Sequence, residues 1–415
     1  MRSESKSLRW FYLPLVLFLA FRIAVLVILY RATGGSEFTS DLWVYELGLK
    51  PFSVLTFSAQ FSDYSQPPLF PLMLAPFALP FSLIFNEFLA SRISFTCFEL
   101  IAFFILARYL ALSDEISLRN RAMVLAIFSV SPLGFMTGAV MRQEEAVVAI
   151  FVTAVLLAVK LGSIKGASLL TFLGMLAGKI LFGIVFFPLL LIAKNKSTIF
   201  YWGILPAILV HAGYALAGYA LTGVIPFIDF APSDTQFCAS PFTLILYFHT
   251  FSGQFVKWLS LSVTGIVLVF LWKRFSMLSQ LEFPSVMIIT FCILFLCFSH
   301  VNTEYHIFVL PLLALIPYAT RLDIRKSSIN ILHAFLAIGT WGYGIIYGVR
   351  AFAEEKSGYS RSKEIALNLY EKVLGFIPIK FSEISLLVLT LVSIFLILIF
   401  IYYSQLAYNN KVVSK

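Results

Sequence analysis

Long apolar runs separated by short polar segments set the pattern of this chain. The first run extends from about Trp10 to Tyr30; it is too long for the core of a signal peptide and has no small-residue cleavage site after it, so we expect it to remain as a membrane anchor. At about 20 residues for each crossing, the runs together predict about twelve transmembrane helices. The predicted fold class is an all-α polytopic membrane protein in which residues 1–415 form a single transmembrane domain.

Clusters of basic residues occur in every second segment between the apolar runs, and these segments are expected on the same side of the membrane. Lys and Arg are enriched in short cytoplasmic loops, and this pattern predicts that both termini are cytoplasmic. The exception is segment 351–381, which carries basic residues but must lie outside; its amphipathic part, Glu364–Leu374, is predicted to lie on the membrane surface. The clusters that set the topology are Arg2, Lys6 and Arg9; Arg119 and Arg121; Lys160 and Lys165; Lys194 and Lys196; Lys273 and Arg274; and Arg321, Arg325 and Lys326.

The proline-rich run from Pro67 to Phe85 is not counted as a crossing. A crossing there would put the basic loop around Arg119 outside, against the positive-inside rule. Its five prolines also make a poor continuous helix, because lipid cannot replace the backbone hydrogen bonds that they remove. We therefore expect an apolar segment along the outer interface, a second crossing from about Ser91 to Leu112, and one large extracytoplasmic loop over residues 32–90.

Composition supports the membrane class and excludes others. The chain is 60% hydrophobic and 12% charged, with a mean hydropathy of +0.93, so it has too little polar surface for a soluble globule. The net charge of +9 comes from dispersed clusters rather than from one basic face, and we expect no nucleic-acid partner. The four cysteines lack metal-site spacing, so no redox or zinc centre is predicted from them.

The first extracytoplasmic loop carries the candidate for catalysis. Asp41 follows the first membrane exit, and a lone carboxylate at that surface is placed for chemistry rather than for packing. Tyr64 and Gln66 belong to a Tyr-Ser-Gln-Pro-Pro-Leu-Phe stretch of the same loop and are candidate ligand contacts. Glu46 and Asp63 are alternatives that could share or take over the role of Asp41.

A second charged group follows the third apolar run, about Ala122–Met136. Arg142, Glu144 and Glu145 lie at the expected start of the next helix, where carboxylates are electrostatically favoured. One interpretation is a ligand-binding site. The alternative is an ordinary charged helix start.

Lys179 interrupts the apolar run from Ala167 to Ala193. About 27 residues are too many for one simple span and just enough for two short helices that meet at Gly178-Lys179. Such a turn offers backbone amides and an ammonium group to an anion, such as a donor phosphate. The alternative is a lysine that only extends toward lipid headgroups.

The late loop at residues 299–306 holds Glu304, Tyr305 and His306, which we expect to contact a ligand. Its two histidines are not spaced as in a zinc site. Arg22 lies near the middle of the first span, where an unpaired guanidinium is costly. We expect it to face the protein interior and to pair with a carboxylate such as Glu99 or with backbone carbonyls.

In this order, the motifs resemble those of the GT-C glycosyltransferases, polytopic enzymes that use polyprenyl-phosphate sugars. The pattern is most similar to the mannosyltransferases that add the first mannose to glycosylphosphatidylinositol anchors and to their prokaryotic relatives. The resemblance covers residues 10–320 as a catalytic module, followed by C-terminal transmembrane helices in 321–415. The matching features are Asp41, Tyr-x-x-Pro-Pro-Leu from Tyr64, Arg-x-x-Glu from Arg142, Gly-Lys-x-x-x-Gly from Gly178 and Thr-x-Tyr-x-x-x-x-x-Pro from Thr303.

The resemblance implies transfer of a sugar, with mannose favoured, from a polyprenyl- or dolichyl-phosphate donor to a lipid-linked or glycan acceptor. Transfer would invert the anomeric carbon at the extracytoplasmic or luminal face of a prokaryotic plasma membrane or an endoplasmic reticulum. Asp41 would act as base or orient the acceptor hydroxyl, Arg142 with Glu144 or Glu145 would lie beside sugar and phosphate, and Lys179 would approach the phosphate. The contacts with the acceptor or the sugar would come from Tyr64, Gln66, Glu304, Tyr305 and His306. The anchor mannosyltransferases carry two aspartates where Ser40-Asp41-Leu42 has one. A divalent metal, Mg²⁺ or Mn²⁺, and an accessory subunit are therefore left open.

Two other classes fit the same topology. A secondary transporter or lipid flippase would show midplane ionisable residues, inverted repeats and paired broken helices, whereas the sequence shows Arg22 and the break at Gly178-Lys179. A structural subunit of a membrane glycosylation complex would make the outer charges incidental. Replacing Asp41 and Lys179 separates the three classes, since an enzyme loses turnover, a transporter loses flux and a scaffold loses neither.

Overall fold

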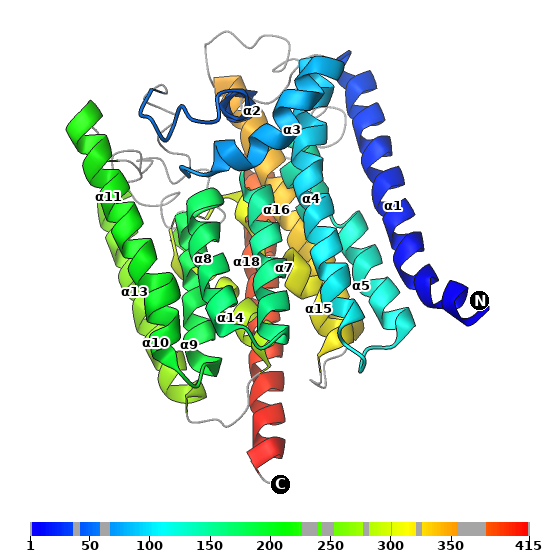
Figure 1. The fold of residues 1–415 in the computed structure, drawn as a ribbon, viewed down its shortest axis with the longest axis vertical. Coiled ribbons are helices and arrows are strands. Elements are labelled where there is room, and N and C mark those ends of the chain that lie inside the picture. Colours follow the sequence, from blue (N-terminus) through cyan, green and yellow to red (C-terminus); the bar gives the residue numbers. More distant parts are fainter. Residues whose placement is uncertain are drawn as a thin grey trace.

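The computed structural model describes residues 2–35, 42–58, 67–223, 225, 240–242, 253–276, 282–299, 301–320, 326–354 and 379–413. These residues form a bundle of helices, and no β-strand occurs among them (Figure 1). The surface stretch predicted at Glu364–Leu374 lies outside the described residues, as do Asp41, Tyr64 and Gln66.

The helices as far as residue 160 include one π-helix, labelled η2. They are α1 (Arg2–Thr33), α2 (Leu42–Leu49), α3 (Phe70–Ile84), α4 (Glu87–Ala111), α5 (Leu118–Val130), α6 (Pro132–Phe135), η2 (Met136–Val140) and α7 (Glu145–Lys160).

The helices after residue 160 include two short 3₁₀-helices, η3 and η5, and a second π-helix, η4. They are α8 (Ile164–Ala177), η3 (Ile180–Val185), α9 (Phe186–Ile192), α10 (Lys196–Ile199), η4 (Phe200–Ile204), α11 (Leu205–Thr222), α13 (Gly253–Phe275), α14 (Phe283–Cys297), η5 (Thr303–Val309), α15 (Leu310–Ala319), α16 (Lys326–Glu354) and α18 (Ile379–Val413).

The membrane character of the chain is carried by long apolar helices. Six helices of the described residues are long and apolar enough to cross a membrane, or seven if the bent pair Leu118–Val130 and Pro132–Val140 is one span. The expected figure of about twelve is not reached by such helices. Further crossings would have to use the shorter apolar helices, such as Ile164–Ala177 and Phe283–Cys297.

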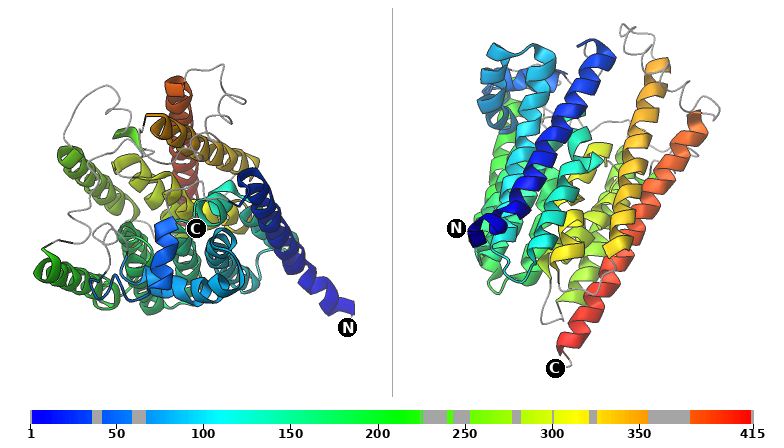
Figure 2. Two further views of the ribbon diagram at one scale, coloured as in Figure 1. Left: turned by 90° about the horizontal axis from the view of Figure 1, so that it is seen from above. Right: turned by 90° about the vertical axis from the view of Figure 1, so that its right-hand side faces the viewer.

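The two ends of the bundle differ. The start of α1 and the end of α18 lie toward one end, and α2 and α3 lie across the other (Figures 1 and 2). We call the latter the α2–α3 end. The second predicted crossing is α4, which begins four residues before the expected Ser91 and ends at Ala111.

The segment around α3 is a short apolar helix at the α2–α3 end (Figure 1), and its predicted place along the outer membrane interface stays a prediction. The expectation that its prolines would prevent a continuous helix was wrong. Pro71 sits in the first turn, where no hydrogen bond is lost, and the helix continues through Pro76 and Pro80. One side packs against α4, while Leu83 is 88% exposed.

The third span is broken where a proline removes a backbone donor. α5 ends at Val130, and the axis bends by 40° before the α6–η2 segment. Pro132 cannot donate to the preceding turn, and the Leu133 amide bonds the Ser131 side chain instead of the Ser129 carbonyl. Arg22 Nη1 donates to that carbonyl at 2.6 Å. The guanidinium therefore supplies the hydrogen bond that the Ser129 carbonyl loses at the break.

The predicted partner of Arg22 is confirmed. Its Nε lies 3.1 Å from Glu99 Oε2, its Nη2 forms an ion pair with the same oxygen, and both side chains are buried. Gly138 makes room for this carboxylate, because a Cβ there would lie 2.1 Å from Glu99 Oε1. The pair ties α1 and α4 to η2 within the bundle.

Two helices, α7 and α14, are largely enclosed by the rest of the bundle. α7 packs against α4 and α8 and also contacts η5. Its residues from Glu145 to Thr153 are all buried, as are those of α14 from Phe283 to Phe295. The start of α7 is therefore held on a rigid core element.

Candidate functional site

A tight turn leads from η2 into α7 and carries the first group of predicted residues. Arg142 has φ of 59°, in the left-handed region that residues with a Cβ rarely adopt. Its amide donates to the Gly138 carbonyl at 3.1 Å, which closes the turn. Glu144 is the N-cap residue of α7 and Glu145 is its first residue, so both carboxylates are fixed at the helix N-terminus, where negative charge is favoured.

Lys179 reaches both carboxylates from the facing break in the chain. Its Nζ forms an ion pair with Glu144 Oε1 and lies 3.1 Å from Glu145 Oε1. The lysine side chain is 18% exposed, and the two carboxylates are 3% and 2% exposed. Two neighbouring buried carboxylates repel each other and lose hydration. The shared ammonium offsets both effects, so the three residues form one electrostatic unit.

The predicted break at Gly178-Lys179 is confirmed. α8 ends at Ala177, and Lys179 is extended, with φ −149° and ψ 140°, before η3 begins. A Cβ at Gly178 would lie 2.5 Å from Val148 Cγ2, one turn into α7. Only glycine allows this approach without displacing the valine. The glycine therefore brings Lys179 within reach of the two carboxylates.

Residues of η5 complete the surroundings of Lys179. The Tyr305 ring centroid lies 5.6 Å from Lys179 Nζ, within the range of a cation–π contact. Glu304 is half-buried and lies close enough to Glu145 for the two carboxylates to interact electrostatically. The late loop predicted as a ligand contact therefore lies against the Lys179 cluster, which we define as Glu144, Glu145, Lys179, Glu304 and Tyr305.

His306 follows this cluster in η5 and is fully buried. Its Nδ1 lies 3.0 Å from the Thr303 carbonyl, and its ring centroid lies 4.8 Å from that of Phe295. A carbonyl can only accept, so Nδ1 carries the hydrogen and Nε2 carries a lone pair. Nε2 is buried, with no hydrogen-bond partner among the described residues.

Two buried arginines lie where the start of α4 meets the turn before α7. Arg142 Nη1 donates to Ser91 Oγ at 3.3 Å. The Arg92 guanidinium lies 3.8 Å from the Phe88 ring centroid, and both arginines are 0% exposed. Sequence reasoning gave Arg92 no role. The signal that could have found it is an arginine within the first two turns of an apolar span, where an ionisable group is costly.

The Lys179 cluster lies at the α2–α3 end of the bundle. The Leu69 amide, just before α3, donates at 2.9 Å to the Leu176 carbonyl, three residues before Lys179. At the opposite end, Lys160 pairs with Glu115 at 2.7 Å. α7, which spans Glu145–Lys160, therefore has the cluster at one end and an exposed ion pair at the other.

The cluster keeps hydrogen-bonding capacity that the described residues do not use. Oε2 of Glu144 and Oε2 of Glu145 are buried without a hydrogen-bond partner in the described part of the chain. An unsatisfied buried acceptor costs about 1–3 kcal/mol. An ammonium has three donors, and the two carboxylates occupy two of those on Lys179. The site can thus accept hydroxyl donors and can still donate one hydrogen bond.

The described residues of this cluster do not suit a metal ion. No group of three or more His, Cys, Asp or Glu side chains that could hold one occurs among the described residues. Glu144 and Glu145 already share the ammonium of Lys179, so a divalent cation would have to displace it. The use of Mg²⁺ or Mn²⁺, which the sequence leaves open, is not decided by these residues, and Asp41 of the first loop lies outside the described residues.

Seven of the ten predicted site residues lie in the described part of the chain. The structure gathers five of them in the Lys179 cluster, places His306 next to it in η5, and anchors Arg142 to α4. Asp41, Tyr64 and Gln66 belong to the part that is not described, so their predicted positions stay predictions. No family model and no curated protein matches the chain.

Proposed function

We propose that the protein is a GT-C-like inverting glycosyltransferase. It transfers a sugar, with mannose favoured, from a polyprenyl- or dolichyl-phosphate donor to a lipid-linked or membrane-associated acceptor. In this proposal the α2–α3 end is extracytoplasmic or luminal, both termini are cytoplasmic, and about twelve segments cross the membrane. The donor and the acceptor are both anchored in the lipid, so a site at the end of the bundle meets their headgroups.

The observation that carries the proposal is the Lys179 cluster itself. Three chain segments converge at one end of an apolar bundle: the start of α7, the break after α8, and η5, which follows that break by more than 100 residues. Ionisable groups in such surroundings are expensive and indicate function by default. Carboxylate acceptors beside a single ammonium suit the hydroxyls of a sugar better than they suit an apolar ligand.

The proposed division of roles follows from charge. Asp41 accepts the proton of the acceptor hydroxyl, whose oxygen attacks the anomeric carbon as the lipid phosphate leaves with the electrons of the broken C–O bond. Positive charge then develops on the sugar ring and negative charge on the phosphate. The carboxylates of Glu144 and Glu145 stabilise the positive charge on the sugar ring. Arg142 and the remaining donor of Lys179 stabilise the negative charge on the leaving phosphate.

A transporter is the second candidate, and one observation favours it. The ionisable Lys179 lies at a break between two short apolar helices, the arrangement in which transporters bind ions and substrates. A flippase or secondary transporter would move a substrate without altering it. The two candidates therefore differ in whether a new covalent product appears.

The experiment supplies purified protein in liposomes with several polyprenyl-phosphate sugars and a membrane lipid extract, and follows products by mass spectrometry. The glycosyltransferase proposal predicts a glycosylated lipid and free polyprenyl phosphate in equal amounts. A Lys179→Gln protein of unchanged thermal stability should form far less product. If the lipids change sides of the bilayer and no product forms with any donor, the transporter is the better account.

A further inference from the structure

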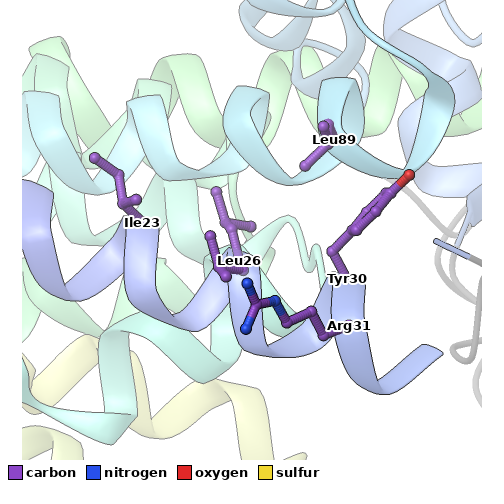
Figure 3. A pocket seen from close by; sticks show the side chains of 6 residues that line it. Ile23, Leu26, Tyr30, Arg31 and Leu89 are labelled. Carbon is purple, nitrogen blue, oxygen red and sulfur yellow. The ribbon is translucent and has the colours of Figure 1, made fainter. Parts of the chain in front are cut away.

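A groove about 320 Å³ in volume lies between α1 and the first turn of α4, away from the Lys179 cluster (Figure 3). Its walls are aliphatic and aromatic side chains from one face of α1 and Leu89 of α4. Ile23 and Val27 are 61% and 46% exposed, so the groove opens outward from the bundle. The lining residues are Ile23, Leu26, Val27, Tyr30, Arg31 and Leu89.

Arg31 gives this apolar groove a single charge. It lies in the last turn of α1, at the α2–α3 end, and its guanidinium extends back along the helix toward Leu26 (Figure 3). Among the described residues it forms no ion pair or hydrogen bond, and none of the described residues that line the groove is acidic. A charge in the last turn gains from the helix dipole, but that does not require the guanidinium to lie over apolar side chains.

We propose that the groove binds an anionic glycerophospholipid, with one acyl chain along α1 and the phosphate on Arg31. The apolar walls match the chain, and the guanidinium supplies the paired donors that a phosphate oxygen prefers. In the topology proposed above the α2–α3 end is extracytoplasmic, where arginine is depleted in membrane proteins, and a lipid phosphate accounts for the presence of Arg31 there. The proposal is independent of the proposed transfer reaction.

Native mass spectrometry of the full chain in detergent tests the proposal. The protein is titrated with phosphatidylglycerol, phosphatidylcholine or diacylglycerol of identical chains. We expect a saturable adduct with phosphatidylglycerol, weaker binding of phosphatidylcholine and none of diacylglycerol. Arg31→Gln should lower the affinity for phosphatidylglycerol about tenfold or more, since a hydrogen bond to a charged group is lost. Arg31→Lys should retain most of it.

Two further variants make the test specific. Arg119→Gln removes the same charge from an exposed arginine at the other end of the bundle and should leave binding unchanged. Leu89→Trp fills the groove without altering charge and should weaken binding even though Arg31 is present. The proposal would be overturned if Arg31→Gln and Arg119→Gln lost the same affinity for phosphatidylglycerol, or if Leu89→Trp bound it unchanged. Displacement of the adduct by millimolar inorganic phosphate would also overturn it. Thermal melting confirms that each variant is folded.

Discussion

Removing Glu99 should destabilise the bundle strongly, because it leaves Arg22 charged in an apolar interior. Arg22 and Glu99 are 2% and 1% exposed, and Arg22 Nε lies 3.1 Å from Glu99 Oε2. Breaking a buried ion pair from one side costs about 3–5 kcal/mol. The Ser129 carbonyl, at 2.6 Å, and the Phe18 ring, at 4.5 Å, still surround the guanidinium. We therefore expect Glu99→Leu to cost about 3 kcal/mol, near the lower limit.

The assay is reversible unfolding in mixed micelles, titrated with dodecyl sulfate and followed by tryptophan fluorescence. The matched control is Glu115→Leu, which breaks the pair with Lys160 whose side chains are 27% and 48% exposed; such exposed pairs contribute about 0–1 kcal/mol. The double variant Arg22→Met/Glu99→Leu should regain most of the loss, since no charge stays unpaired. If Glu99→Leu costs no more than Glu115→Leu, the reasoning about the buried pair is refuted.

Three further outcomes are expected. Gly178→Ala should lower the melting temperature and the transfer rate because its Cβ would lie 2.5 Å from Val148 Cγ2, and Val148→Ala in the same chain should restore both; no rescue would contradict the close contact. Lys179→Gln should reduce transfer more than Lys179→Arg, because only arginine keeps the charge that both carboxylates share; equal rates would contradict this role. In a cysteine-free background, Phe52→Cys should react with an impermeant maleimide from outside and Asp114→Cys only after permeabilisation; labelling from the same side would contradict the topology.

Several features of the fold could be predicted from the sequence because lipid imposes simple rules. Apolar length located α1 and α4, and the cost of an isolated charge in hydrocarbon identified Glu99 as the partner of Arg22. The break at Gly178-Lys179 followed from a run too long for one span. These are local or strongly constrained features.

Other features depend on how the helices pack against one another, which the pattern of apolar residues in the sequence does not predict. The helix α3 continues through Pro76 and Pro80 because their missing donors are tolerated in a short segment packed against α4. The number of crossings was set by run length, but several helices at the centre of the bundle have fewer than 18 residues. Helices of this kind need a protein surrounding, which a length rule does not detect.

The site was predicted as a collection of charges at one end, and their pairing was not. The sequence indicated Lys179 as a group for phosphate, whereas the structure shows it bound to Glu144 and Glu145. Residues 35 positions apart meet because Gly178 permits close approach to α7, a contact that no spacing rule contains. Arg92 was assigned no role from the sequence, and its complete burial depends on packing that the sequence does not show.

The most direct test of the account compares transfer rates of three proteins in liposomes with the same polyprenyl-phosphate sugar and acceptor lipids. They are the unaltered chain, Asp41→Asn, and Glu115→Gln as a control for loss of a carboxylate at the other end of the bundle. The account predicts a fall of about 100-fold to 10,000-fold for Asp41→Asn, as expected on removing a general base, and no change for Glu115→Gln. Full activity of a folded Asp41→Asn protein, or no product from the unaltered chain with any donor, would contradict it.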